Sequence, residues 1–185
     1  MKIKPAPKKG NVIVELASKD EAILKPLPIE LQRILVPMDF SDTARKALQY
    51  ALPFAVAFGA ELVLVHVMQP YILPPETGYL PPELAVSEHE LADSAREKLD
   101  KLCAAEIGTR ARSQAQVRVG VPWYEIVSAA VETNADLIIV STHGRTGLKH
   151  ALMGSVAERV VRHAPCPVLV VRDRERDFIP ISGQP

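Results

Sequence analysis

Residues 137–171 read LIIVSTHGRTGLKHALMGSVAERVVRHAPCPVLVV and contain the signals of one strand–helix–strand unit. Two wholly apolar runs, Leu137–Val140 and Val168–Val171, stand at its ends, which is typical of strands buried on both faces. Between them, Ser155–Glu158 (SVAE) matches a capping box that opens a helix, and Pro165 ends that helix. Two buried strands joined through a helix predict part of a parallel sheet.

The same alternation extends toward the N-terminus. Arg33–Pro37 (RILVP) and Leu62–Val67 (LVLVHV) are two further short apolar runs, whereas Gln114–Val119 (QAQVRV) alternates polar and apolar residues and predicts an edge strand. Apolar residues recur at helical spacing between these strands: Ala44, Ala47, Leu48, Ala51, Ala55 and Phe58; Leu84, Leu91, Ala95, Leu99 and Leu102; and Ile126, Val127, Ala130 and Val131. Five strands alternating with helices predict an α/β domain with a parallel sheet and right-handed crossovers.

Residues suited to helix ends flank these stripes. Ser41 or Asp42 is placed to cap the first helix, and Pro53 inside it predicts a kink. Gly108 is suited to end the second helix, and Pro122 suits the first turn of the third.

Composition limits the classes of function. The 185 residues are 48% hydrophobic with a formal net charge of zero and a pI near 7.0, which suits one domain with a tail and argues against a nucleic-acid partner. Cys103 and Cys166 lack metal-ligand spacing and predict reduced thiols. The Lys-rich N-terminus lacks a signal-peptide apolar stretch, and no apolar run approaches membrane-spanning length. We therefore expect a cytoplasmic protein without membrane association.

The two ends of the chain differ from the middle. Met1–Gly10 is rich in Lys and Pro and is expected to be a flexible tail, whereas Asn11–Leu16 (NVIVEL) predicts either an ordered short strand or a loose arm. We expect an N-terminal extension over residues 1–30, one domain over residues 31–173 and a charged C-terminal tail over residues 174–185.

The loops that follow the strands are the candidate ligand-binding segments, because ligands of open parallel sheets bind beyond the carboxyl ends of the strands. Asp39 follows the first strand, where its carboxylate could accept hydrogen bonds from ribose hydroxyls or hold a metal ion. Alternatively, Asp39 only helps to cap the next helix.

A glycine-containing loop, Ser141–Leu148 (STHGRTGL), follows the strand that ends at Val140, and Gly154-Ser155 then opens the last helix. Glycines allow close approach of a phosphate, and a helix N-terminus suits an anion. Alternatively, these residues serve only a turn and a cap. We expect the fold to accept an aspartate in place of Gly154, unless that residue requires a positive φ.

The chain lacks the GxxxxGK[ST], GxGxxG, GxSxG and HExxH motifs, and its five histidines lack metal-ligand spacing. His143 is the histidine best placed for a functional role, because it lies in the candidate phosphate loop. We predict no catalytic residues and no protein metal site.

Several of these segments together resemble the universal stress protein family over about Gln32–Arg172. They are Pro37–Ser41 (PMDFS), His66-Val67, Val119–Pro122 (VGVP), Ser141–Glu158 and Ala164–Val171 (APCPVLVV). The resemblance implies a Rossmann-like, doubly wound, five-stranded parallel sheet of order 3-2-1-4-5, with helices on both faces. It also implies a homodimer formed through the last strand, and its glycine spacing resembles the ATP-binding branch of the family.

The resemblance implies ten nucleotide-binding residues. Asp39 would contact the ribose, Val67 would meet adenine through its backbone, and Pro37 and Val140 would line the pocket. The phosphates would be held by Gly144, Gly154, Ser155 and Val156. Two residues depart from the family pattern: Ser141 replaces the first glycine of the motif, and Met38 stands where a small or hydroxyl residue is frequent. A positive φ at Ser141 would strain it by about 1 kcal/mol or more.

The family likeness implies an ATP-binding regulatory module of the stress response, with Mg²⁺ or Mn²⁺ as the accompanying metal. A nucleotide-free dimeric interaction protein is the first alternative, for which Ser141 is the best support. A slow Mg²⁺-dependent ATP hydrolase is the second.

Overall fold

The computed structural model describes residues 2–5, 12–15, 29–69, 88–143 and 153–172. The chain divides into two compact units, Met1–Glu30 and Leu31–Pro185. Leu84, Gly144 and the predicted C-terminal tail lie outside the described residues. The division into an extension, one domain and a tail stays a prediction.

The second unit contains a five-stranded parallel sheet in the order β5-β4-β3-β6-β7. The predicted fold class and the predicted strand order 3-2-1-4-5 are thereby confirmed. The elements in chain order are β3 (Arg33–Pro37), α1 (Asp42–Phe58), β4 (Glu61–Met68), α2 (Glu88–Leu102), the π-helical turn η3 (Cys103–Ile107), β5 (Ser113–Val119), α3 (Pro122–Glu132), β6 (Leu137–Ser141), α4 (Ser155–His163) and β7 (Val168–Val171).

The first unit contains a two-stranded antiparallel sheet of β1 (Lys2–Pro5) and β2 (Val12–Glu15). The expectation of a tail over Met1–Gly10 is therefore wrong for β1, whereas β2 falls within the segment for which a short strand was one alternative. The physical reason is pairing, because an isolated strand leaves its backbone groups without partners. The register joins Lys2 to Glu15 and Pro5 to Val12.

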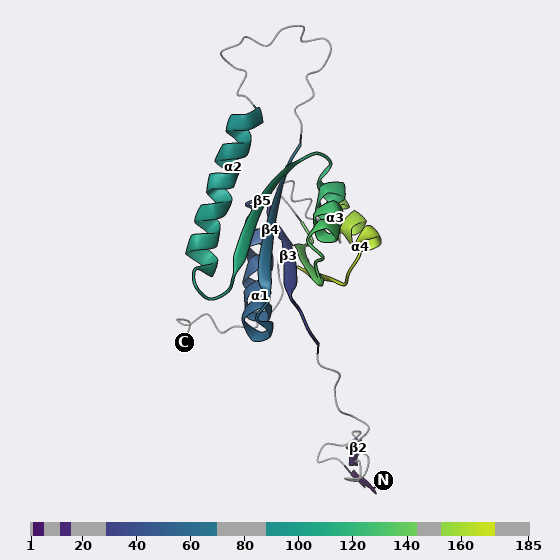
Figure 1. The fold of residues 1–185 in the computed structure, drawn as a ribbon. Coiled ribbons are helices and arrows are strands. Elements are labelled where there is room, and N and C mark those ends of the chain that lie inside the picture. Colours follow the sequence, from purple (N-terminus) through teal and green to yellow (C-terminus); the bar gives the residue numbers. More distant parts are fainter. Residues whose placement is uncertain (1, 6–11, 16–28, 70–87, 144–152, 173–185) are drawn as a thin grey trace. The chain divides into compact units, whose positions relative to one another are not determined.

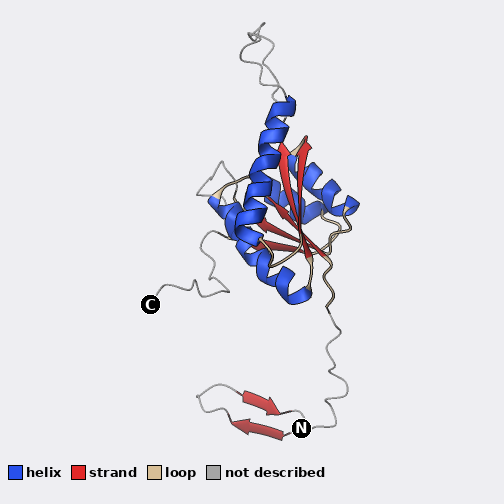
Figure 2. Ribbon diagram, turned by 60° about the vertical axis from the view of Figure 1, so that its left-hand side comes forward, coloured by secondary structure: helices blue, strands red, loops and turns tan. Residues whose placement is uncertain are grey.

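Helices cover both faces of the main sheet, as the ribbons show (Figures 1 and 2). Helices α1 and α2 pack on one face, and α3 and α4 pack on the other. Successive side chains of β3 point to opposite faces of the sheet, so this strand contributes to both core clusters. Ile34 and Val36 lie in the cluster under α1 and α2, whereas Leu35 lies in the cluster under α3 and α4. Both faces are buried, so the strands read as continuous apolar runs.

The start of α1 follows the predicted cap. Ser41 is the N-cap, and its hydroxyl oxygen accepts from the amide of Ala44 at 3.2 Å. The helix ends at Gly59, whose φ of +67° is the left-handed conformation that favours glycine. Pro122 takes the first turn of α3, also as predicted.

The start of α4 differs from the predicted capping box. The N-cap is Gly154 and makes no side-chain cap hydrogen bond, so Ser155 is the first helical residue. Glu158 instead donates its amide to the carbonyl of Gly154 at 3.0 Å, as an ordinary helical bond. The SVAE pattern thus lies one residue too late for a capping box, and the Ser155 side chain remains exposed at the helix start.

The edge strand β5 uses its polar face to hold α3. The guanidinium of Arg118 donates to Glu132 at 2.8 and 2.9 Å and to Glu125 at 2.9 Å. The hydrogen bond from Arg118 holds the pKa of the Glu132 carboxyl below its usual value. The polar alternation of β5 that indicated an edge therefore also ties the edge to a helix.

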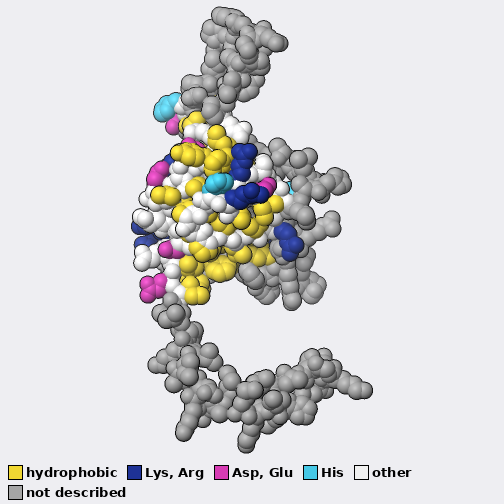
Figure 3. All heavy atoms as spheres, turned by 90° about the vertical axis from the view of Figure 1, so that its right-hand side faces the viewer, with side chains coloured by type: hydrophobic (Ala, Val, Ile, Leu, Met, Phe, Trp, Pro, Cys, Tyr) yellow, Lys and Arg dark blue, Asp and Glu magenta, His cyan; other side chains and the backbone are white. Residues whose placement is uncertain are grey.

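The outer side of α3 and α4 keeps an apolar character, and Figure 3 shows apolar side chains gathered on this face. Tyr124, Val131 and Val161 are each about half exposed there. No helix in the described parts of the chain has the length and apolar content to cross a membrane.

The sheet topology makes a prediction for hydrogen exchange. Ile34–Val36 lie in the central strand β3 and Ile138–Val140 lie in its inner neighbour β6, and both segments are buried on both sides, so their amides should be among the slowest to exchange. Amide exchange followed by NMR measures this directly. Fast exchange in β3 or β6 would contradict the central position of these strands.

Candidate functional site

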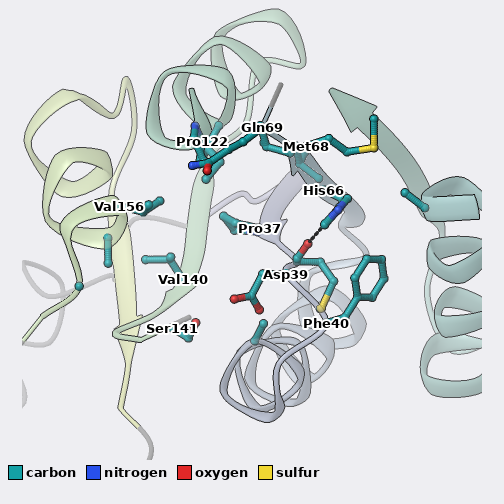
Figure 4. Close-up of a pocket in the computed structure, with 18 of the residues that line it drawn as sticks. Pro37, Asp39, Phe40, His66, Met68, Gln69, Pro122, Val140, Ser141 and Val156 are labelled. Carbon is teal, nitrogen blue, oxygen red and sulfur yellow. Dashed lines mark hydrogen bonds between the residues drawn. The ribbon is translucent and has the colours of Figure 1, made fainter. Parts of the chain in front are cut away.

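A pocket of about 630 Å³ lies at the carboxyl ends of β3, β4 and β6. Figure 4 shows Pro37, Asp39, Val140, Ser141 and Val156 around it. Nine of the ten residues predicted from the resemblance line this pocket: Pro37, Met38, Asp39, Val67, Val140, Ser141, Gly154, Ser155 and Val156. The tenth, Gly144, lies outside the described residues. The structure therefore brings together segments that are more than one hundred residues apart in the sequence.

Asp39 directs its carboxylate into the pocket (Figure 4). Its Oδ1 atom accepts from the amide of Ser41 at 3.0 Å and from the Ser41 hydroxyl at 2.5 Å. Ser41 in turn caps α1. The alternative of a capping role for Asp39 therefore holds only indirectly, because Asp39 orients the residue that caps, and it does not exclude a ligand contact.

A chain of hydroxyl groups continues from Ser41 to the loop after β6. The Ser41 and Thr43 hydroxyl oxygens are 2.9 Å apart, and the Thr43 hydroxyl donates to the carbonyl of His143 at 2.7 Å. The loop after β3 is thus tied to the residue that precedes Gly144. Thr43 was missed by the sequence analysis, since a threonine in a first helical turn carries no pattern that points to a distant loop.

The backbone of Ser141 has an unstrained conformation at the pocket. It is not among the described non-glycine residues with positive φ, which are Phe40 and Asn134, so the strain considered for Ser141 does not arise. Its hydroxyl donates to the carbonyl of His143 at 2.9 Å. The side chain that replaces the family glycine is therefore folded back onto its own loop.

Gly154 is required by close packing. Its amide donates to the carbonyl of Thr142 at 2.7 Å, and its φ is −71°. A Cβ atom at this position would stand 2.9 Å from the same carbonyl oxygen. The expectation that the fold accepts an aspartate at Gly154 is therefore wrong, for a reason of contact distance and not of backbone dihedral.

The N-terminus of α4 opens on the pocket beside Gly154, Ser155 and Val156. The first amides of a helix lack intrahelical partners, and the helix dipole favours negative charge there. This end of the pocket therefore suits an anion such as a phosphate group.

Two aromatic rings, of Phe40 and His66, lie across the pocket from Val156 (Figure 4). Phe40 has a φ of +65°, which is costly for a bulky residue, and its ring lies 4.6 Å from the ring of His66. The Nδ1 atom of His66 lies 2.6 Å from the carbonyl oxygen of Met38. Strained residues of this kind gather at functional sites. No sequence pattern predicted either feature.

The described residues contain no group of three or more His, Cys, Asp or Glu side chains that could hold a metal ion. Asp39 is the carboxylate of the pocket. Mg²⁺ in proteins is commonly held by one or two carboxylates together with substrate phosphates, so the donor set suits an ion that arrives with a phosphate ligand.

Comparison with known proteins gives one consistent result. The model of the universal stress protein family matches residues 30–172. A universal stress protein of Methanocaldococcus jannaschii is 38% identical over 149 residues, which are 79% of this chain and 85% of that protein. A second universal stress protein of the same organism is 30% identical over 79% of this chain and 98% of its own length.

Solved structures agree with these sequence matches. The structure of the second relative covers 80% of this chain and all of its own chain, with a TM-score of 0.67. A universal stress protein solved in complex with cAMP shares the fold over 78% of this chain and 98% of its own, at 23% identity and a TM-score of 0.55.

The close approach at Gly154 predicts the effect of one added methyl group. Gly154→Ala should lower the free energy of unfolding by about 1–3 kcal/mol, because the new Cβ must displace the Thr142 carbonyl. Thermal unfolding should show a drop of several degrees, at about 2–4 °C per kcal/mol. Ser155→Ala is the matched control, because the exposed Ser155 makes no cap bond. Equal melting temperatures for both variants would contradict the close contact.

Proposed function

The chain belongs to the universal stress protein family, and from this premise we propose that it binds ATP in the pocket at the carboxyl ends of β3, β4 and β6. The bound nucleotide acts as a signal that regulates a stress response. One observation carries the proposal: the loop after β3, the end of β6 and the N-terminus of α4 converge on one pocket.

Each part of a nucleotide has a matching part of this pocket. Pro37, Val67, Val140 and Val156 form apolar surfaces suited to a flat base, as small-molecule pockets are mostly apolar with few polar groups. The Asp39 carboxylate is an acceptor for ribose hydroxyls. In this proposal the backbone of Val67 meets the adenine edge, and Met38 and Ser141 complete the lining.

The phosphates belong at the start of α4 in this proposal. The amides of Ser155 and Val156 and the Ser155 hydroxyl are the donors, and the amide of Gly144 is assigned to the same role. The resemblance implied Gly154 as a further donor, but its amide already donates to the Thr142 carbonyl, so Gly154 contributes through its position at the helix start. The folded-back Ser141 side chain supports this view, because it removes the main objection that favoured a nucleotide-free interaction protein. Mg²⁺ or Mn²⁺ would enter bound to the phosphates, with Asp39 as the carboxylate that lines the pocket.

Regulation follows from the bonds that surround the pocket. Asp39 holds Ser41, and Thr43 holds His143, so a ligand between these loops acts on both α1 and the loop after β6. The hydroxyl–imidazole pair that the described residues place here, Thr142 Oγ1 and His143 Nδ1 at 3.0 Å, involves a threonine that is only 3% exposed, which favours a binding signal over a hydrolase. A slow, metal-assisted hydrolysis remains the second candidate and is tested by turnover at saturating ATP.

The proposal also includes a homodimer formed through β7. This strand stands at the edge of the sheet, and its first three residues, Val168, Leu169 and Val170, are apolar and only partly buried. An apolar edge strand presents unpaired backbone groups, which a twofold mate would cover. We assign the protein to the cytoplasm, in keeping with its two free thiols, Cys103 and Cys166.

Ser155→Asp separates phosphate binding from helix capping. The new carboxylate stands where a triphosphate should lie, and two unit charges about 4 Å apart repel by about 4 kcal/mol at an effective dielectric near 20, before salt screening. ATP affinity, measured by calorimetry, should fall at least about tenfold. The unliganded helix should gain several tenths of a kcal/mol, because an acidic residue suits a helix N-terminus.

The matched control is Ser155→Asn, which adds nearly the same volume without the charge and should bind ATP within about threefold of the parent. If Ser155→Asp binds ATP as the parent does, the phosphates do not lie at the start of α4.

The dimer has its own test. Sedimentation at micromolar concentration should show a dimer for the parent, and Val170→Asp should convert it to monomer by placing a charge in the apolar strand pair. Val131→Asp is the control, because the half-exposed Val131 lies on α3, away from β7. A monomeric parent, or a Val170→Asp variant that still dimerises, would contradict pairing through β7.

A further inference from the structure

The pocket has two halves, and the nucleotide residues account for one of them. Residues of β4 alternate between the faces of the sheet, so Val65 and Val67 face α3 and α4, whereas His66 and Met68 face α1 and α2. The aliphatic nucleotide residues Pro37, Val140 and Val156 lie on the side of Val67. The half on the α2 side has no assigned ligand.

Figure 4 shows this division: Phe40, His66 and Met68 lie on one side of Pro37, and Val140, Ser141 and Val156 lie on the other. The contact between His66 Nδ1 and the Met38 carbonyl, at 2.6 Å, holds the imidazole on the α2 side. Phe40 packs against that imidazole with a centroid distance of 4.6 Å. An aromatic wall is therefore fixed between the two halves.

Helix α2 supplies the facing wall through one stripe. Leu91, Ser94, Ala95 and Lys98 all line the pocket, and their spacing of three and four residues places them on one side of the helix. Leu91 is 50% exposed, although leucine favours burial. The stripe thus combines an apolar end with a hydroxyl group and an ammonium group.

Lys98 is the basic side chain of α2 without an acidic partner among the described residues. The other three are paired along the helix: His89 with Asp93 at 3.6 Å, Arg96 with Asp100 at 3.2 Å and Lys101 with Glu97 at 2.6 Å. The residues three and four positions from Lys98 are Ser94, Ala95, Lys101 and Leu102, and none of them is acidic. Its ammonium group is therefore available to an anion in the pocket.

We propose that the half of the pocket between the Phe40–His66 pair and the α2 stripe is a second binding compartment, for a small amphipathic carboxylate. The apolar or aromatic body of this ligand lies against Phe40, Met68 and Leu91. Its carboxylate pairs with Lys98 and accepts from the Ser94 hydroxyl. The Asp39 carboxylate in the other half disfavours the reverse orientation, since like charges repel. The compartment does not depend on nucleotide binding.

The test uses 4-phenylbutyrate and its neutral counterpart 4-phenylbutanol, titrated into the full chain and followed by amide NMR shifts. We expect saturable shifts within Leu91–Lys98 and about threefold or more tighter binding of the acid than of the alcohol. Lys98→Met should abolish that preference, and Lys98→Arg should keep it. Lys101→Met is the matched control, because its ammonium is held by Glu97 and does not line the pocket.

Each of the following results would overturn the proposal. The first is no saturable shift in α2, the second is equal affinity of the parent for acid and alcohol, and the third is an acid preference that survives in Lys98→Met. A loss of preference in Lys101→Met would have the same meaning, because it would show a general effect of charge. Displacement of the acid by ATP in direct competition would assign this half to the nucleotide instead. The Lys98 variants are compared in the absence of nucleotide. A failure of this proposal can therefore be distinguished from a failure of ATP binding.

Discussion

The structure around the pocket depends on the bonds made by two consecutive carbonyls at the end of β6. Thr142, which is only 3% exposed, receives the amide of Gly154 on its carbonyl at 2.7 Å and donates its own amide to Val171 at 2.9 Å. The next carbonyl, of His143, accepts the hydroxyls of Thr43 and Ser141. These bonds join α4, β7 and the first turn of α1 to one point. Only a glycine at position 154 lets α4 start so close to the strand.

This point lies where the strand order reverses, between β3 and β6, and there the connections on either side leave the sheet in opposite directions. The crevice results from this topology. The hydrogen bonds of the Thr142 and His143 carbonyls hold the segments around it in place. On the α4 side, the crevice ends at a helix N-terminus, which is suited to phosphate. On the α2 side, it ends in an aromatic pair and an ammonium group. The carboxyl ends of the strands therefore offer two chemically different surfaces within one pocket.

Much of the fold followed from the sequence, because apolar runs such as Ile34–Val36 indicate strands buried on both faces, and the polar alternation in β5 indicated its place at the edge of the sheet. The cap at Ser41 was also predictable, since it is a local bond. The SVAE pattern predicted the N-cap of α4 one residue too late, at Ser155, because Gly154 itself serves as the N-cap. The contacts of Thr43 and the φ of Phe40 depend on tertiary packing, and no local pattern encodes them. Helical spacing placed Leu91 and Ala95 on one face of α2, but the position of that face beside the pocket also depends on tertiary packing.

In the proposed function, the pocket binds the phosphates of an adenine nucleotide as well as its base and ribose. Calorimetric titration of the full chain with ATP and, separately, with adenosine tests it most directly. We expect one site per chain, with ATP bound at least about tenfold more tightly than adenosine, because the helix amides contact only the phosphates. Equal affinity for the two ligands, or no saturable heat with ATP, would contradict the account.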